Sequence, residues 1–164
     1  MSGAAAGTAA DPGDDLRLDR QLCFALYDAS REVVRLYRPL LESLGLTYTQ
    51  YVAMLALWER DGVSVGSLGA RLSLDTGTLT PLLKKLESMG LVNRVRDERD
   101  ERSVRVSLTP AGRVLRERAA GIPAAAACAS GLDPVEIAEM RDRLHRLVRD
   151  LRAAGGNPAP DADV

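Results

Sequence analysis

The chain has 164 residues and a net charge of −1, and apolar residues make up 46 % of it. This composition supports one globular domain with a buried core and excludes a disordered, collagen-like or disulfide-dense chain. No apolar run approaches the roughly 18 residues that span a bilayer. The acidic, Ala/Gly-rich start lacks the features of a secretory signal, so we expect a cytoplasmic protein without a membrane partner.

The charge is unevenly distributed along the chain. Five aspartates lie in residues 1–15 and 153–164, which are rich in Gly, Ala and Pro and are expected to be disordered tails. Without them, residues 16–152 carry a net charge of +4, almost entirely on arginines. An excess of this size permits binding to nucleic acid but does not require it.

Apolar residues spaced three and four apart predict helices in the first half of the chain. Pro39 is expected to kink or interrupt the first of them. Thr47, followed by Gln50 three residues later, predicts a capping box at the start of the second. The expected ranges are Leu22 to Gly45, Thr47 to about Asp61, 64–72, and Asp75 or Thr76 to Gly90.

The periodicity becomes strand-like after Gly90. Residues 92–96 and 104–108 alternate or nearly alternate and are rich in β-branched side chains, and the segment DERDERS lies between them. This pattern predicts a β-hairpin with a charged tip.

Two more helical regions follow the hairpin. Thr109-Pro110 predicts a helix to about residue 128, disturbed at Gly121 and Pro123. Asp133-Pro134 predicts the start of a last helix. Its apolar residues repeat at three- and four-residue steps: Ile137, Met140, Leu144, Leu147 and Leu151.

Three short helices followed by a hairpin is the order of a winged helix-turn-helix. The expected fold is mainly α with a small β-hairpin. The first and last helices have apolar seams without a partner in so small a chain, so we expect a homodimer. The expected division is 16–46 for N-terminal dimerisation and sensor helices, 47–109 for the DNA-binding domain, and 110–152 for C-terminal dimerisation helices.

Three segments resemble the MarR family of transcriptional regulators, and most closely its organic-hydroperoxide-sensing OhrR branch. They are QLCFALY at 21–27, LGLTYTQYVAMLALWE at 44–59, and the run from Leu74 to Gly112 that contains LTPLLKKLESMGLVNRVRDERDER. The resemblance implies a homodimeric repressor that binds double-stranded operator DNA when reduced. An organic hydroperoxide would be the effector that releases it.

The helix at 74–90 is expected to contact DNA. Leu79, Leu82, Leu83 and Leu86 share one face, which would pack on the core. Threonines can contact base edges, and lysines can contact phosphates. The candidate DNA-binding residues of this helix are Asp75, Thr76, Thr78, Lys84 and Lys85. Pro81 leaves open whether the helix begins after Asp75 or after Thr80, and the resemblance favours the earlier start.

The tip of the hairpin supplies three further candidates, Arg99, Asp100 and Arg102. An arginine at a wing tip can enter the narrow minor groove of DNA. The resemblance implies that Arg102 does so, steadied by Asp100. The alternative is a solvated turn with balanced charge.

The chain has two cysteines, Cys23 and Cys128. The position of Cys23 early in its helix favours a thiolate, and Tyr27 follows one turn later. The resemblance implies that Tyr37 and Tyr48 donate hydrogen bonds to the sensor sulfur. With its second cysteine the chain resembles the two-cysteine type, which implies that oxidised Cys23 forms a disulfide with Cys128 of the other subunit. The alternative is a pair of buried, inert thiols.

Three rival functions differ in their chemistry. One is a MarR-type repressor released by a small aromatic ligand without cysteine chemistry. A thiol peroxidase is disfavoured because the lone His145 lies on the last helix and no catalytic motif is present. The third is a protein that only dimerises. We therefore expect no enzyme, no catalytic residue, no metal site and no cofactor.

Overall fold

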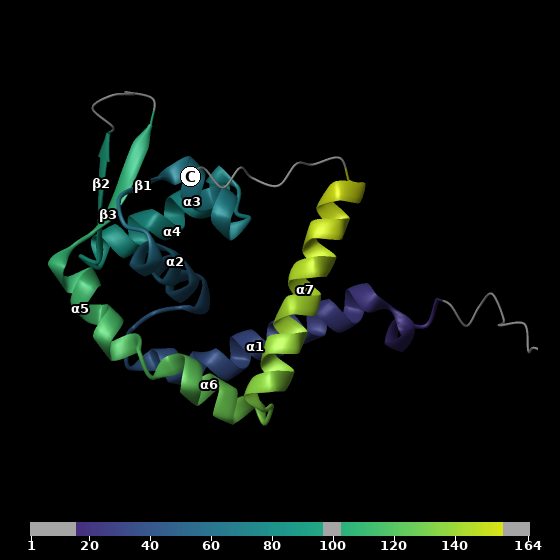
Figure 1. Ribbon diagram of the computed structural model, residues 1–164. Coiled ribbons are helices and arrows are strands. Elements are labelled where there is room, and N and C mark those ends of the chain that lie inside the picture. The colour runs from purple at the N-terminus through teal and green to yellow at the C-terminus, as the bar shows by residue number, and fades with distance from the viewer. Residues whose placement is uncertain (1–15, 97–102, 156–164) are drawn as a thin grey trace, which may run out of the picture. The chain divides into compact units, whose positions relative to one another are not determined.

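The computed structural model describes residues 16–96 and 103–155 (Figure 1). It divides the chain into two units, Met1–Arg35 and Leu36–Val164. In the first unit, the short 3-10 helix η2 (Leu18–Arg20) precedes the beginning of α1 (Leu22–Glu42). Several large apolar side chains of this unit are exposed: Leu16, Leu18, Leu22, Tyr27, Val33 and Val34.

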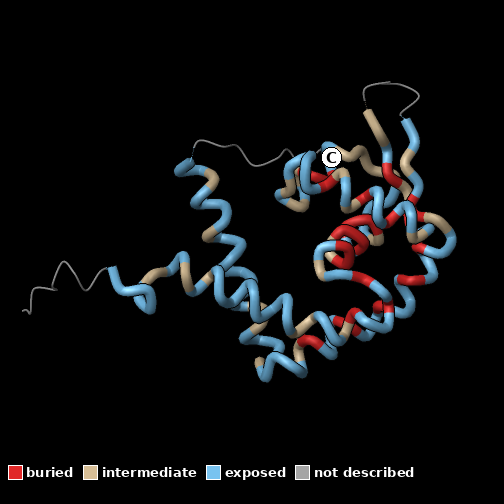
Figure 2. Tube along the Cα trace, turned by 180° about the vertical axis from the view of Figure 1, so that it is seen from behind, coloured by how far each residue is buried: buried red, intermediate tan, exposed pale blue. Residues whose placement is uncertain are grey.

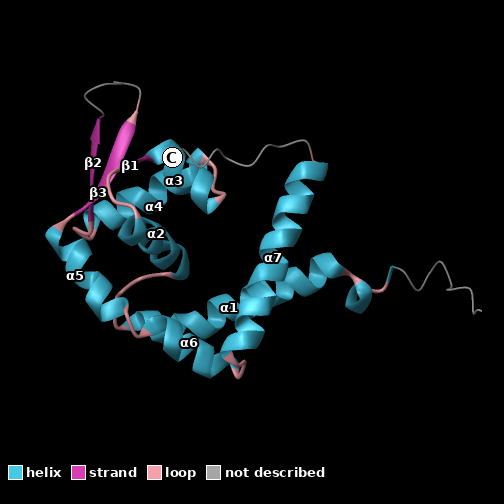
Figure 3. Ribbon diagram, viewed as in Figure 1, coloured by secondary structure: helices cyan, strands magenta, loops and turns pink. Residues whose placement is uncertain are grey.

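The second unit is mainly helical with a small antiparallel sheet, which confirms the expected fold class (Figure 3). After the end of α1, its elements follow in this order: α2 (Tyr48–Glu59), β1 (Val63–Ser64), α3 (Val65–Leu72), α4 (Thr76–Ser88), β2 (Val92–Arg96), β3 (Val104–Leu108), α5 (Pro110–Ala119), α6 (Ile122–Ser130) and α7 (Pro134–Ala154). Among the described residues, no helix is both long enough and apolar enough to cross a bilayer.

The sheet has the strand order β1-β3-β2. The hairpin strands have the predicted bounds, with Val92 paired to Leu108 and Arg96 to Val104. The third strand, β1, was not predicted. It pairs Val63 with Val106, and two residues are too few for a periodic signal.

The core lies between α2, α3, α4 and the sheet. Tyr51, Met54 and Leu57 of α2 are 2 % exposed or less. The predicted leucine face of α4 is confirmed, because Leu79, Leu83 and Leu86 are buried there and Leu82 is partly buried. Figure 2 shows many buried segments in this part of the unit, and the core continues to Leu41 at the end of α1 and to Leu115 and Ile122 in α5 and α6. Burial of one face of α4 leaves its opposite face available to solvent.

Side-chain caps set the starts of several helices. Thr47 and Gln50 form the predicted capping box at α2, with the Thr47 N–H donating to Gln50 Oε1 at 2.9 Å. Asp133 and Glu136 form a second capping box at α7. Each cap satisfies backbone N–H groups that the first turn of a helix leaves unpaired.

The segment after the hairpin differs from the prediction in two respects. The single helix expected to reach residue 128 is instead two helices. The first, α5, ends at Ala119, and the second, α6, begins at Ile122. Pro123 lies in the first turn of α6, where the missing N–H is harmless. The last helix runs to Ala154, two residues beyond the predicted end at 152. No residue of α7 is buried in the single chain (Figure 2).

Candidate nucleic-acid interface and redox site

The start of α4 is set by Asp75. One Asp75 carboxylate oxygen accepts the backbone N–H of Thr78 at 2.8 Å, and the other accepts the Thr78 hydroxyl at 3.1 Å. These two bonds lower the pKa of Asp75, because both favour the charged carboxylate. The helix therefore begins at Thr76, which agrees with the earlier of the two starts.

Pro81 lies inside α4, six positions after its cap. It cannot donate to the carbonyl of Gly77, so one intrahelical bond is missing. Gly77 is exposed, and water can solvate this carbonyl.

The polar face of α4 gathers the candidates that the sequence placed there. Thr76, Thr78, Lys84 and Lys85 are all exposed, whereas Leu79, Leu83 and Leu86 are buried. The Thr78 hydroxyl proton is donated to Asp75, so in this arrangement its oxygen can act only as an acceptor toward a base edge. The two adjacent lysines remain as point charges for phosphates.

Glu87 joins α4 to β2 and was missed by the sequence reasoning. One carboxylate oxygen accepts the backbone N–H of Arg94 at 3.2 Å, and the other lies 3.7 Å from Nη1 of Arg94. The pair bridges two elements that are separated by a turn. No helical or strand period indicates such a contact.

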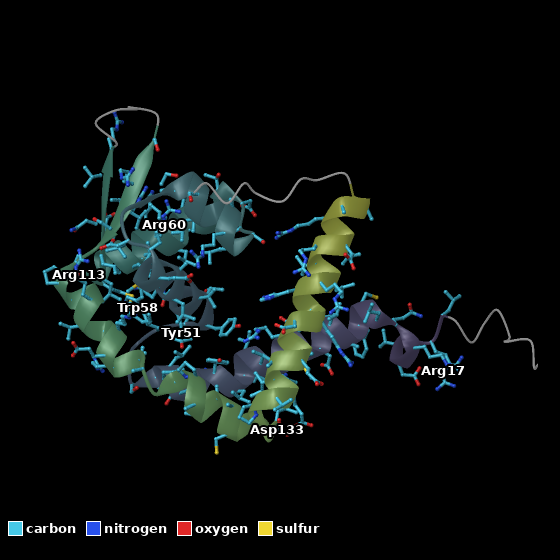
Figure 4. The ribbon with its side chains drawn as sticks, viewed as in Figure 1. Arg17, Tyr51, Trp58, Arg60, Arg113 and Asp133 are labelled. Carbon is cyan, nitrogen blue, oxygen red and sulfur yellow. The ribbon has the colours of Figure 1, made fainter. Side chains whose placement is uncertain are left out.

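Two hydrogen bonds join the start of α5 to its neighbours, α2 and the turn before β2. The Trp58 indole N–H donates to the Gly112 carbonyl at 2.8 Å, and the Thr109 hydroxyl donates to the Gly90 carbonyl at 2.6 Å. Figure 4 labels Trp58 on α2 and Arg113 on α5. A Cβ at Gly112 would clash with the carbonyl oxygen of Leu91, so this close approach of backbones requires glycine.

The hairpin tip lies outside the described residues. The structure follows β2 to Arg96 and resumes at Ser103, so the predictions for Arg99, Asp100 and Arg102 concern a segment that it does not describe.

The first unit holds Cys23 and Tyr27. Cys23 is the second residue of α1 and is exposed. Arg31 Nη1 donates to the Tyr27 hydroxyl at 2.8 Å, and its guanidinium lies 5.4 Å from the centre of the Tyr27 ring. These residues are spaced four apart and share one side of the helix. Arg31 was missed, although this spacing could have indicated it.

Tyr37 and Tyr48 lie together in the second unit. Their ring centres are 5.3 Å apart, and Tyr51 lies 5.9 Å from Tyr37. Burial raises the pKa of Tyr37, and the neighbouring Tyr48 raises it further. A raised pKa keeps the Tyr37 hydroxyl protonated at neutral pH, so it can donate a hydrogen bond. Tyr51 is a core residue, 2 % exposed.

Cys128 lies in α6, three residues before the left-handed Gly131 that ends this helix. Its thiol is exposed, as is that of Cys23, so the alternative of two buried thiols is wrong for the single chain. Exposure makes both sulfurs accessible to an oxidant or to another thiol.

Comparison with known proteins places this arrangement in a family. A family model described as "Transcriptional regulator SarA/Rot" matches residues 35–118. The organic hydroperoxide resistance transcriptional regulator of Bacillus subtilis (strain 168) is 44 % identical over 138 residues, which cover 84 % of this chain and 94 % of that protein. The chain belongs to the MarR family of winged helix-turn-helix regulators, in the organic hydroperoxide resistance branch.

Two solved structures of AbfR from Staphylococcus epidermidis share the fold of this MarR-family chain at 34 % identity. Reduced AbfR bound to DNA matches with a TM-score of 0.74, covering 86 % of this chain and 96 % of that one. Disulfide-formed AbfR matches with a TM-score of 0.57, covering 87 % and 94 %. The relatives are transcriptional regulators, a class of proteins distinct from enzymes.

Proposed function

We propose that this MarR-family protein is a homodimeric repressor that binds operator DNA when reduced and releases it when an organic hydroperoxide oxidises Cys23. The observation that carries the DNA-binding part is the two-sided α4. Its leucines fix the helix on the core, while Thr78, Lys84 and Lys85 are exposed away from them and Thr76 is exposed at the first turn. A helix presented in this way beside a hairpin fits the major groove.

The dimer is supported by apolar side chains that the single chain leaves exposed. On α7 these are Val135, Met140, Leu144, Val148 and Leu151, and each is at least 41 % exposed. The first unit exposes a further set along η2 and α1. Exposed apolar seams of this extent are typical of subunit interfaces. The proposed dimerisation segments are 16–46 and 110–152, on either side of the DNA-binding domain at 47–109.

The proposed sensor chemistry takes place on two sulfurs. The Cys23 thiolate attacks the terminal peroxide oxygen, the O–O bond breaks, and the alcohol leaves with a proton, so that cysteine is oxidised to sulfenic acid while the peroxide is reduced. The Cys128 thiolate of the other subunit then attacks the Cys23 sulfur, the S–O bond breaks, and a disulfide forms while the hydroxide takes up a proton and leaves as water. AbfR, solved in reduced and disulfide forms, supports redox regulation by relatives of this fold.

Tyr27, Tyr37 and Tyr48 are the proposed donors to the sensor thiolate. Tyr27 already accepts from Arg31, which orients its hydroxyl on the side of α1 that carries Cys23. Hydrogen bonds to a thiolate stabilise the charged form and therefore lower the pKa of the cysteine. The role of the protein is regulatory, in the cytoplasm, and the peroxide is consumed only stoichiometrically.

The deciding experiment is a gel-shift assay with and without cumene hydroperoxide. The operator is obtained by selecting random-sequence DNA with the reduced protein. Wild type should bind the selected site and release it on oxidation, while Cys23→Ser should bind equally well and ignore the peroxide. If Cys23→Ser still releases DNA with a normal dose response, Cys23 is not the sensor.

Release by a small aromatic ligand is the second candidate, and one observation favours it. A cavity of about 500 Å3 has the apolar residues Leu57, Trp58 and Leu108 in its lining, and Arg116 lines it as well. This volume and apolar lining suit a small aromatic ligand. Release of DNA by salicylate from the Cys23→Ser variant would support this candidate over the redox one.

A further inference from the structure

The side chain of Glu87 connects the last turn of α4 to the third residue of β2. One of its oxygens accepts the backbone N–H of Arg94, and the other lies 3.7 Å from the guanidinium of the same residue. A single carboxylate therefore holds both the backbone and the side chain of Arg94.

The backbone bond lies on the outer edge of the sheet. β2 is an outer strand in the order β1-β3-β2, and Arg94 is in register with the buried Val106 of β3. An N–H that points outward from an edge strand has no neighbouring strand whose carbonyl could accept its hydrogen bond. Glu87 supplies the missing acceptor, which fastens β2 to α4 as well as to β3.

The side-chain contact is partly shielded from water. The Arg94 side chain is 21 % exposed, and its Nε is buried without a hydrogen-bond partner among the described residues. Removing water from a charged guanidinium costs free energy, and a nearby carboxylate offsets that cost. Glu87 provides that charge from the helix side.

We propose that Glu87 is a positioning residue for DNA binding, which sets the wing strands β2 and β3 relative to α4. This inference rests on the proposed function, in which α4 and the wing contact the same DNA. Two elements can engage neighbouring grooves together only when their spacing suits the duplex. Ordering a loose wing during binding would reduce affinity, whereas a tethered wing is ordered beforehand.

Simple electrostatics predicts the opposite effect of removing Glu87. A carboxylate at the DNA-binding surface repels phosphates, so its loss should raise affinity for DNA of every sequence. A positioning role lowers affinity for the operator and leaves affinity for scrambled DNA unchanged or raised. The ratio of the two affinities therefore separates positioning from mere charge.

The experiment measures binding of the selected operator and of scrambled DNA at one salt concentration. Glu87→Gln keeps an oxygen for the Arg94 N–H but loses the charge, and Glu87→Ala loses both. The affinity ratio should fall roughly fivefold for Glu87→Ala, about 1 kcal/mol at 25 °C, and less for Glu87→Gln. Glu59→Gln is the matched control, because Glu59 is ion-paired with Arg71 between α2 and α3. It should leave the ratio unchanged.

Hydrogen exchange without DNA tests the tether separately. The Arg94 amide should exchange faster in Glu87→Ala than in wild type, while the core amides of Leu83 and Val106 keep their protection. Unchanged Arg94 exchange, or an unchanged affinity ratio, would overturn the inference. If Glu87→Ala does not fold, the ratio of operator affinity to scrambled-DNA affinity in Glu87→Gln tests the proposal. A wild-type protein that cannot distinguish operator from scrambled DNA would refute the proposed function instead, while exchange would still report on the tether.

Discussion

The backbone N–H of Thr78 donates to the carboxylate of Asp75 at 2.8 Å, and the Thr78 hydroxyl donates to the other oxygen of the same carboxylate. Thr78 thus uses both of its donors on one residue. The start of α4 is therefore stabilised by two hydrogen bonds to Asp75, one from the backbone and one from the side chain of Thr78. It also fixes the hydroxyl of a residue proposed to meet a base edge.

The lowered pKa of Asp75 predicts a pH-dependent contribution to stability. A carboxyl whose pKa is lower in the folded than in the unfolded state stabilises the fold above its unfolded pKa, near 4. This contribution is lost as the pH falls through the folded pKa. Asp75→Asn should therefore lower the Tm at pH 7, and the difference from wild type should shrink below about pH 4. Thermal unfolding at several pH values measures this, with Asp142→Asn as the control for removing one exposed charge. A difference from wild type that does not shrink as the pH falls below about 4 would contradict it.

An intersubunit disulfide predicts a covalent dimer. Reduced protein treated with cumene hydroperoxide should run at twice the monomer mass on a non-reducing gel, and dithiothreitol should reverse this. Cys128→Ser should remove the dimer band and leave Cys23 open to sulfinic acid, which mass spectrometry detects. A Cys23–Cys128 bond within one chain would keep the monomer mass in wild type and refute the intersubunit model.

The tyrosine donors are tested by their effect on thiol oxidation. Tyr37→Phe and Tyr48→Phe each remove one hydroxyl that is proposed to stabilise the Cys23 thiolate, so each variant should react more slowly with cumene hydroperoxide. Stopped-flow measurement of the oxidation rate checks this. Tyr51→Phe changes the buried member of the cluster and should leave the rate unchanged. An unchanged rate in both test variants would limit these tyrosines to shaping a pocket.

Arg102 is predicted to reach the minor groove from the wing tip. Arg102→Ala should leave the Tm nearly unchanged, because an isolated charge in water contributes little to folding. It should weaken operator binding and flatten the plot of log affinity against log salt by roughly 2 units, one contact for each subunit of the dimer. Asp100→Ala should weaken binding less, because the arginine stays but is less ordered. Arg141→Ala on α7 controls for the loss of one arginine elsewhere. An unchanged slope in Arg102→Ala would leave recognition to α4.

Local sequence signals predicted most of the elements. Apolar spacing and caps located α2 and α7, and alternation located β2 and β3 at their observed bounds. The leucine face of α4 followed from its period alone. These features depend on residues a few positions apart, so a single stretch of sequence contains the information that decides them.

Tertiary structure decided the features that join distant residues. β1 exists because Val63 meets Val106, and α5 is joined to α2 because Trp58 reaches Gly112. The tether between Glu87 and Arg94 depends on where the turn after α4 directs β2. In each case the energy comes from a hydrogen bond or a pairing between separate elements. The residue spacing around one partner carries no information about which distant residue it contacts. Only the folded chain shows these pairings.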